Sequence, residues 1–513
     1  MTDWTDGYVS DIEYLPGFYM EQTPGHLDTA CLLQAIEPPV SAGEPFRYCE
    51  LGCGVGETAL AIAAANPRSD VWGFDFNPAH IARGKNLARK GGLANINLVE
   101  ASFEDLARSD RNEYGLFDYI ALHGVWSWVS PANRTHIVRF IDRHLKPGGL
   151  VYITYNALPG WTSAMPVQRL LRMFAQAAHD RSDRTVVRAL DSVRTYAEAG
   201  STYVPADLLE RLDKERDGGK LSYLSHEYLN AHWAPCYQVD VARDLGEAKL
   251  SYIGSATLLE NYPDLCLTAQ QRELLASTPA AFAETAKDFL MIRPFHRDVF
   301  VRGARRIPER RLDERIRQTR LALVVPQSAV TRDIKIPLGE ATLNESFYAP
   351  ALEALADVPR TVGELMDLAQ ADRSTVSPRE VLGMLVGSRQ ALTLPNEVDA
   401  SAIGTVRRYN VAHLKACADE ARAISALAAL GIGSAITVRL FEMLAYEAIA
   451  GGTEVDPASL TEATWEMLKA RGDKITNEGK IVEDPAENLK IIRENMEAVV
   501  SAAVPIWRRV GAI

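Results

Sequence analysis

The sequence predicts an α/β fold, in which helices cover both faces of a doubly wound parallel sheet. Short apolar segments alternate with helical segments between residues 46 and 155, and a glycine-rich turn follows the first apolar segment at Gly52, Gly54 and Gly56. Alternation of this kind is typical of parallel strands, because each parallel connection has to cross over the sheet. The 513 residues also exceed what one hydrophobic core usually serves, so several domains are expected.

Five parallel strands are expected in the first part of the chain, at residues 46–51, 71–75, 96–100, 117–122 and 150–155. Helices are expected between them at residues 57–65, 78–90 and 131–145, and the second of these opens with Pro78. Lys146, Pro147, Gly148 and Gly149 should break the chain before the fifth strand begins.

Two more strands are expected much later, at residues 249–253 and 297–302. Residues 167–212 are charged and periodic and should form a helical insertion, and residues 239–248 should form a helix before the sixth strand. We predict that the two late strands pair antiparallel and extend the sheet that holds residues 46–51. The domain that contains the sheet would then be discontinuous along the chain.

The character of the sequence changes after residue 310. Residues 359–369 and 378–394 resemble a helix-turn-helix with a following strand, as in winged-helix domains. Residues 400–513 are predicted to form a mostly helical C-terminal region. Residues 424–438 are apolar but are interrupted by glycines, which favours a buried helix pair over a membrane span. The predicted domains are residues 1–165, 166–234, 235–305, 306–400 and 401–513.

The composition narrows the class of function. A net charge of -12 argues against a nucleic-acid partner, because phosphate-binding surfaces need an excess of Lys and Arg. Six scattered cysteines without a CxxC pair suggest reduced thiols, and the acidic N-terminus lacks a signal-peptide pattern. No run of about 18 apolar residues occurs. The sequence therefore predicts a cytoplasmic protein without a membrane span.

The glycine-rich turn predicts a nucleotide-like cofactor, since glycines let the backbone approach a ligand closely. Its pattern is GxGxG, and Glu57 stands where a dinucleotide site would have its third glycine. Glu50 lies at the tip of the first strand and suits an ammonium group, whereas Asp75 ends the second strand and suits two ribose hydroxyls. These features favour S-adenosylmethionine over NAD, in a Rossmann-like domain at residues 1–165.

The adenine should lie after the third strand, where Ser102 offers a polar side chain and Phe103 an apolar face. Ser102 equally resembles a helix N-cap, with Asp105 three residues later, and both roles can coexist. The predicted cofactor-binding residues are Glu50, Gly52, Cys53, Gly54, Gly56, Asp75, Phe76, Ser102, Phe103 and His123. No metal ligand is predicted.

The methyl acceptor should face the loops after the fourth and fifth strands, because ligands of open α/β sheets bind beyond the carboxyl ends of the strands. These loops, at residues 122–128 and 155–161, provide the predicted catalytic residues His123, Trp126, Tyr155, Asn156 and Trp161. The alternative is that Trp126, Trp128 and Trp161 only pack a lid onto the domain. His123 is either a base for an amine acceptor or a hydrogen-bonded wall residue.

Two other segments carry residue types that are common at functional sites. His226 and Glu227 look like half of an HExxH zinc motif, but the second histidine is missing, because His232 lies six residues after His226. The N-terminal segment is rich in aromatic residues and either covers the cofactor as a lid or docks on the core. These residues are Trp4, Tyr8, Tyr14, Phe18 and Tyr19.

The chain resembles bacterial methyltransferases that carry a methyltransferase regulatory domain, a family that includes rickettsial protein lysine methyltransferases acting on outer-membrane proteins. The resemblance covers roughly residues 5–305 and the C-terminal third matches loosely. It rests on residues 50–56, HGVWSW at 123–128, YNALPGW at 155–161, YLSHEYLN at 223–230, 248–256 and FHRDVFVRG at 295–303. It implies a Rossmann-like domain with helical appendages, S-adenosylmethionine as cofactor, and a homodimer.

Three functions follow as alternatives. The first is an enzyme that methylates lysine amines of a protein, which is what the rickettsial resemblance implies. The second is a methyltransferase that acts on a small molecule or a glycan, and the third is a regulator that binds the cofactor without catalysis. The intact glycine turn and Asp75 disfavour the third.

Overall fold

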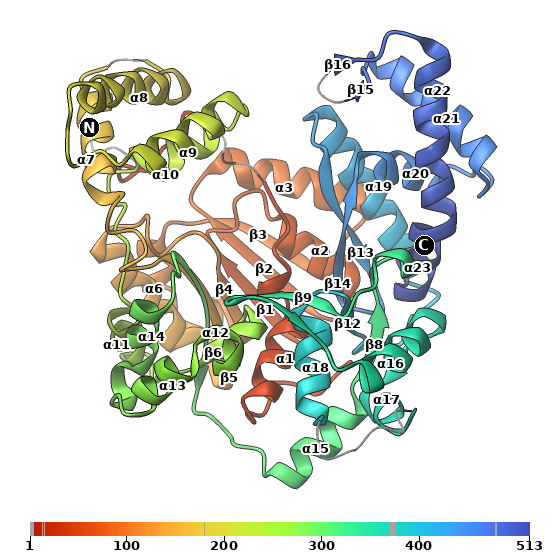
Figure 1. Cartoon of the computed structure of the whole chain (residues 1–513), viewed down its shortest axis with the longest axis horizontal. Helices are drawn as coiled ribbons and strands as arrows, with labels where there is room; N and C mark the ends of the chain where they lie inside the picture. The colour runs from red at the N-terminus through yellow and green to blue at the C-terminus, as the bar shows by residue number, and fades with distance from the viewer. Residues whose placement is uncertain (1–4, 13, 15, 179, 369–375, 478–479) are drawn as a thin grey trace.

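A seven-stranded sheet forms the centre of the computed structural model, which describes residues 5–12, 14, 16–178, 180–368, 376–477 and 480–513 (Figure 1). The strand order is β3-β2-β1-β4-β5-β7-β6. The strands are β1 (Arg47–Leu51), β2 (Asp70–Asp75), β3 (Ile96–Glu100), β4 (Phe117–Leu122), β5 (Leu145–Asn156), β6 (Leu250–Ser255) and β7 (Phe295–Arg302).

The predicted topology is confirmed. Strands β1 to β5 are parallel, β7 pairs antiparallel with β5, and β6 pairs antiparallel with β7. The predicted break before β5 is wrong, because β5 already begins at Leu145 and runs through Lys146 to Gly149. A register shift between Phe117 and Tyr119 on β4 and a positive φ of 80° at Gly148 accommodate the Pro-Gly-Gly sequence within the strand.

Alternate residues of the central strands face opposite layers of helices, as the period of two in a strand requires. Tyr48, Tyr119 and Tyr152 pack in one core with α1 (Pro24–Leu33) and α2 (Glu57–Ala65). Cys49, Ile120 and Ile153 pack in another core with helices on the opposite face. Those helices are α4 (Phe103–Arg108), α6 (Pro131–His144) and α11 (Gln238–Gly246), while α3 (Pro78–Gly91) packs beside α2 and β3.

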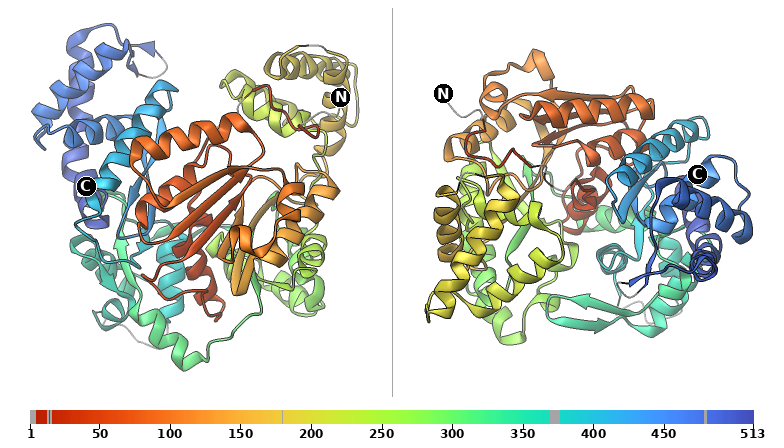
Figure 2. Two further views of the ribbon diagram at one scale, coloured as in Figure 1. Left: turned by 180° about the vertical axis from the view of Figure 1, so that it is seen from behind. Right: turned by 90° about the horizontal axis from the view of Figure 1, so that it is seen from above.

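Four helices form the predicted insertion between β5 and β6. They are α7 (Met165–Gln176), α8 (Ser182–Glu198), α9 (Ala206–Asp217) and α10 (Leu221–Leu229), and they share an apolar core of their own. Between β6 and β7 lie α12 (Pro263–Cys266), α13 (Ala269–Ala276) and α14 (Ala283–Leu290). Figure 2 shows the insertion at one side of the sheet and the C-terminal helices at the other.

The segment from residue 309 to residue 393 contains the two expected helices and the strand, and residues 369–375 between the helices lie outside the described residues. Helices α17 (Val362–Leu368) and α18 (Pro378–Gly387) precede β12 (Ala391–Thr393), although residue 369 of the predicted first helix lies outside the described residues. Strand β12 pairs with β8 (Arg320–Leu323), which also pairs with β11 (Arg360–Thr361). The other elements are α15 (Glu309–Gln318), β9 (Asp333–Ile336), β10 (Gly339–Thr342) and α16 (Glu345–Asp357).

The prediction of a buried helix pair at residues 424–438 is wrong. This segment is an antiparallel hairpin of β13 (Ile424–Ala429) and β14 (Ser434–Arg439) that packs against α2 and α19 (Ile403–Asp419). Gly433, with a φ of 59°, makes the turn between the strands. The alanines and the leucine of β13 suit a helix as well as a strand, but Ile436, Thr437 and Val438 are β-branched and favour the strand β14.

The rest of the C-terminal region is helical, as predicted. Its helices are α20 (Leu440–Ala450), α21 (Pro457–Arg471), α22 (Pro485–Ala498) and α23 (Val504–Val510), and its last short strands are β15 (Thr476–Asn477) and β16 (Lys480–Ile481). No helix within the described residues is both long and apolar enough to cross a membrane. All six cysteines are buried and free.

Candidate active site

A cavity of about 570 Å³ opens at the carboxyl ends of the parallel strands, where the sequence predicts the cofactor. Its walls come from the loops after β1 to β5, from the N-terminal segment, from α9 and α10, and from the start of β7. The predicted site residues that line it are Glu50, Gly52, Cys53, Gly54, Asp75, Phe76, Ser102, Phe103, His123, Asn156 and Trp161. Gly56, Trp126 and Tyr155 do not line it.

The loop after β1 is shaped by left-handed glycines. Gly52 has a φ of 69°, and a Cβ at this position would come within 2.6 Å of the Val125 side chain from the loop after β4. Gly54 has a φ of 57°, and its N–H donates a hydrogen bond to Asp75 Oδ2 at 2.8 Å. Gly56 lies just behind the cavity as the N-cap residue of α2. Only glycine fits the close approach at Gly52, whereas at Gly54 the positive φ favours glycine, and both leave the backbone bare toward the cavity.

Asp75 ends β2 with its carboxylate nearly buried. Its Oδ2 accepts from the Gly54 amide, and its Oδ1 accepts from the Asn77 amide at 2.9 Å and lies 3.3 Å from His80 Nδ1. A carboxylate offers about four acceptor positions, so Oδ2 keeps room for one more donor. The protein therefore fixes Asp75 firmly but leaves it able to bind a hydroxyl group.

Glu50 is a buried carboxylate with one oxygen unpaired. Gln22 Nε2 donates to Oε1 at 3.0 Å, whereas Oε2 has no hydrogen-bond partner among the described residues. Burial raises the pKa of Glu50 to about 8. A buried acceptor without a donor is costly unless a ligand supplies one, so Glu50 fits a cationic group in the cavity.

The side of the cavity after β3 combines Ser102 with the ring of Phe103. Ser102 forms the expected capping box, because its Oγ accepts from the Asp105 amide at 3.1 Å and the Asp105 carboxylate accepts from the Ser102 amide. The Ser102 hydroxyl also donates to Asp105 at 2.6 Å, so it is already engaged within the helix cap.

His123 is held as a wall residue. Its ring stacks on Tyr19 with centroids 3.6 Å apart, and its Nδ1 lies 3.1 Å from the Tyr152 hydroxyl. Burial, together with the nearby charge of Arg297, lowers the pKa of His123 to about 3. An imidazole with this pKa is a weak base near neutral pH, so its environment favours the hydrogen-bonded wall residue over the base.

The N-terminal segment covers the cavity. Tyr8, Tyr14 and Tyr19 line it, and Tyr8 meets Phe76 edge to face at 5.8 Å. Backbone bonds tie this segment to the end of α10, where the Val9 amide donates to Asn230 Oδ1 at 2.8 Å and the Ala231 amide donates to the Gly7 carbonyl. Phe18 packs with the core between α2 and α3, and Trp4 lies outside the described residues. The segment thus combines the predicted lid with docking on the core.

Aromatic side chains dominate the far end of the cavity, which we call the acceptor end. Its rings come from the N-terminal segment, the loops after β4 and β5, helix α10 and the start of β7; they are Tyr14, Trp128, Trp161, Tyr223 and Phe295. Trp161 is oriented by a hydrogen bond from its Nε1 to the Pro294 carbonyl at 2.8 Å. Polar groups at this end are Asn156, Arg211 and Glu227.

Glu227 was missed by the sequence interpretation, which set His226 and Glu227 aside as an incomplete zinc motif. Helix α10 carries Glu227 into the acceptor end, where it is only 6% exposed. His226 lies outside the cavity lining, with its Nε2 3.2 Å from the Ile12 carbonyl. A glutamate on the otherwise apolar side of α10 was the signal in the sequence, since unpaired acids are rarely buried.

Trp126 and Tyr155 require a correction, because the structure does not bring them to the acceptor end. Trp126 is fully buried in the core between the sheet and α6, and the Arg134 guanidinium lies 5.6 Å from its ring centroid. Tyr155 is also buried, stacks on His296 and donates to Asp298 at 2.6 Å. Neighbouring residues at a strand end point to opposite faces, so Asn156 reaches the cavity whereas Tyr155 does not.

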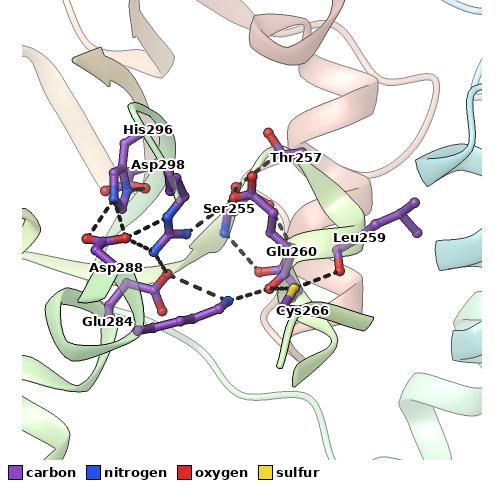
Figure 3. A network of polar contacts seen from close by, with 12 residues as sticks. Ser255, Thr257, Leu259, Glu260, Cys266, Glu284, Asp288, His296 and Asp298 are labelled. Carbon is purple, nitrogen blue, oxygen red and sulfur yellow. Dashed lines mark hydrogen bonds and ion pairs between the residues drawn. The ribbon is translucent and has the colours of Figure 1, made fainter. Parts of the chain in front are cut away.

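A buried network of charges lies behind the acceptor end (Figure 3). Arg293 is 3% exposed and bonds the carboxylates of Asp288, Glu284 and Glu260. His296 lies between Asp288 and Asp298, at 3.0 Å and 2.9 Å. Although burial lowers its pKa, the two carboxylates outweigh this and raise the pKa of His296 to about 9. The network therefore holds the backbone of Pro294 and Phe295, which wall the cavity.

The C-terminal region contacts the end of the glycine-rich loop after β1, which we call the cofactor loop, through an ion pair with Glu57. The carboxylate of Glu57, the first residue of α2, pairs through both oxygens with the guanidinium of Arg422. Glu57, His413 and Cys417 also offer ligand atoms within 4.8 Å of one another. Arg422 already neutralises the carboxylate of this group, and Ser425 lies 2.8 Å from His413 Nε2, so the cluster is satisfied by the protein itself.

Known proteins resemble this chain in sequence and in fold. Residues 49–151 match the methyltransferase domain family, and residues 220–302 match the family described as the predicted methyltransferase regulatory domain. The chain is 33% identical to the uncharacterised protein sll1526 of Synechocystis over 526 residues, which cover 99% of each chain. Protein RP028 of Rickettsia prowazekii is 31% identical over 43% of this chain and 86% of its own length. PKMT2 from Rickettsia typhi in complex with AdoHcy has a TM-score of 0.68 at 19% identity, covering 98% of this chain and 99% of that chain.

The fold, the cofactor loop and these matches define an S-adenosylmethionine-dependent methyltransferase. Within that class, the chain belongs to the bacterial methyltransferases that carry a methyltransferase regulatory domain. The regulatory-domain match includes α10, β6 and β7, so the region that completes the sheet also supplies Glu227 and Phe295 to the cavity.

Proposed function

We propose that this enzyme transfers the methyl group of S-adenosylmethionine to a lysine amine of a protein. The observation that carries the proposal is the acceptor end, where aromatic rings surround one buried carboxylate, Glu227. A lysine side chain is a thin apolar stem that ends in a cation. Aromatic rings attract such a cation, and they exclude water from the reacting groups.

The same proposal assigns the cofactor to the loops after β1, β2 and β3. Glu50 would hold the ammonium group of the methionine part, Asp75 the ribose, and Ser102 with Phe103 the adenine. The bare glycine backbone and the unpaired Glu50 Oε2 support this placement. The bound cofactor supplies an activated methyl group on a sulfonium, and the protein contributes alignment of that group with the acceptor nitrogen.

The proposed role of Asp75 is tested by Asp75→Ala. We expect the affinity for S-adenosylmethionine to fall by about 2–4 kcal/mol, because hydrogen bonds from the ribose to a buried charged group would be lost. Isothermal titration calorimetry measures this loss directly. Asp70→Ala is the matched control, since Asp70 opens the same strand but lies outside the cavity lining. A loss below about 0.5 kcal/mol for Asp75→Ala would mean that the ribose binds elsewhere.

A second candidate is methylation of a small molecule or glycan. The cover formed by Tyr8, Tyr14 and Tyr19 favours it, because a roofed cavity suits a compact acceptor. Lysine methylation requires that the peptide reach the cavity past Arg211, which is exposed at the acceptor end. The proposal of a protein substrate therefore also predicts that the acceptor enters beside α9.

The experiment that decides between them uses cell extract, purified enzyme and S-adenosylmethionine with an isotope-labelled methyl group. We expect label in protein, and peptide mass spectrometry should locate it on lysine. A parallel reaction with the Asp75→Ala variant controls for methyltransferases in the extract. Label confined to the small-molecule fraction would refute the protein substrate and support the second candidate.

A further inference from the structure

We propose that Glu227 is a catalytic residue that binds the acceptor's ammonium group and takes its proton, so that the acceptor is an amine. This inference rests on the proposed function and deepens it. Glu227 projects from α10 into the acceptor end of the cavity. Asn156 at the end of β5 lines the same cavity, and its side-chain amide contacts the Glu227 carboxylate, so the carboxylate lies beside the strand end that the sequence assigns to the acceptor.

Glu227 has no cationic partner within the part of the chain that the structure describes. Its one hydrogen bond from the protein is long, at 3.4 Å between Asn156 Nδ2 and Oε2. The nearest cation, Arg211, is engaged elsewhere: it donates to the Tyr228 hydroxyl at 3.0 Å and lies 5.6 Å from the centre of the Trp161 ring. A buried carboxylate that faces a cavity without a counterion indicates a ligand that brings a donor or a positive charge.

The groups around Glu227 hold its pKa near neutrality, so that it can gain or lose a proton near pH 7. Burial is the largest cause that raises the pKa of Glu227, Asn156 and Arg211 lower it, and the charge of Glu215 on α9 raises it, with a net result of about 7. The remaining titratable neighbours are Tyr8, Tyr14, Tyr223 and Tyr228, whose own pKa values are raised by burial, so they stay neutral near neutral pH. A carboxylate with a pKa near neutrality can both attract an ammonium group and accept its proton.

The ammonium group of the acceptor gives one proton to the Glu227 carboxylate and becomes a neutral amine with a free electron pair. That pair forms the new nitrogen–carbon bond as the methyl carbon–sulfur bond breaks, and the electrons of the broken bond stay on sulfur. The positive charge moves from sulfur to the methylated nitrogen, and the proton on Glu227 passes to solvent when the product leaves.

The first test compares Glu227→Gln with Glu210→Gln. Glu210 lies on α9 and is exposed and paired with Lys214, so the control changes the same charge outside the cavity. For Glu227→Gln we expect kcat/KM for the acceptor to fall about 100-fold or more, with the Kd for S-adenosylmethionine unchanged. We expect kcat/KM of the wild type to rise with pH around pH 7, and this rise should be lost in Glu227→Gln. A fall of less than about threefold would overturn the proposal.

The second test needs neither cofactor nor turnover. The folded pKa of Glu227, about 7, lies above the value of about 4.3 for an unfolded glutamate. Because folding raises this pKa, the contribution of Glu227 to the free energy of unfolding is complete below the pKa of the unfolded glutamate and is lost as the pH rises through 7. The Tm of Glu227→Gln should therefore exceed that of the wild type increasingly from pH 5 to pH 8.5. A Tm difference that does not change with pH would contradict the unpaired buried carboxylate.

The outcomes separate this inference from the proposed function. If label appears on lysine but Glu227→Gln turns over normally, Glu227 is not the proton acceptor although the protein substrate stands. If label appears on a small-molecule amine and turnover of that amine falls in Glu227→Gln, the protein substrate fails and the role of Glu227 stands. Methylation of a carbon or a hydroxyl group would overturn the assignment of an amine acceptor.

Discussion

Replacing Arg293 by alanine is expected to lower the free energy of unfolding by about 3–5 kcal/mol, the usual cost of removing one partner from a buried ion pair. Arg293 is 3% exposed and lies among the carboxylates of Glu260, Glu284 and Asp288. Its removal would leave these acids buried without their common counterion. Urea unfolding followed by circular dichroism measures the loss.

A matched control is Arg243→Ala on α11, because Arg243 also pairs with two acids but is 69% exposed. Exposed pairs contribute at most about 1 kcal/mol, so this variant should unfold almost like the wild type. Equal losses in the two variants would mean that burial of the Arg293 network adds nothing to stability.

The Arg293 variant should also change how stability depends on pH. Burial raises the pKa of Glu284, but Arg293 and Lys287 outweigh burial and lower it below its usual value. A lowered pKa gives stability that is present above the unfolded pKa and lost as the pH falls. The variant lacks this contribution, so its difference from the wild type should shrink between pH 7 and pH 4.

The sheet could be predicted because its strands are separated by crossover helices and read as apolar segments. The sequence FDYIAL at residues 117–122 is buried at every position in β4, as expected for a parallel strand with both faces covered. The hairpin of β13 and β14 could not be predicted in the same way. Alanine and leucine in β13 fit a helix as well as a strand, so contact with α2 and α19 decides the conformation there. The β-branched Ile436, Thr437 and Val438 of β14 were a strand signal that the interpretation as an apolar helix pair did not use.

The cofactor half of the candidate site was predictable for a local reason. Glycines at residues 52, 54 and 56 and the acid at residue 75 follow directly from strand ends, and parallel strands bring such ends together. The acceptor half depends on contacts between distant segments. Glu227 lies 71 residues after Asn156 in the sequence, and only the fold of the helical insertion brings the two side chains together.

The directions of side chains explain the remaining error. Both loops, after β4 and after β5, line the cavity, but the sequence does not say which tryptophan of residues 126 and 128 faces it. Trp128 lines it and meets Tyr14 at 5.9 Å, whereas Trp126 turns into the core. These two residues therefore offer a direct comparison between a packing role and a role at the site.

Replacing Trp126 by alanine is expected to cost about 3–5 kcal/mol of unfolding free energy, because its fully buried ring fills the core and the surrounding side chains cannot close the space. Any loss of turnover or of cofactor affinity in this variant should accompany the loss of stability. Trp128→Ala should instead lower turnover while S-adenosylmethionine binds nearly as before, since the lost ring only widens an existing cavity. Unfolding, calorimetry and methyl transfer should be measured on both variants. The Trp126→Ala protein could instead be stable and bind the cofactor but fail to transfer the methyl group. That result would contradict the packing role and show that Trp126 acts at the acceptor site.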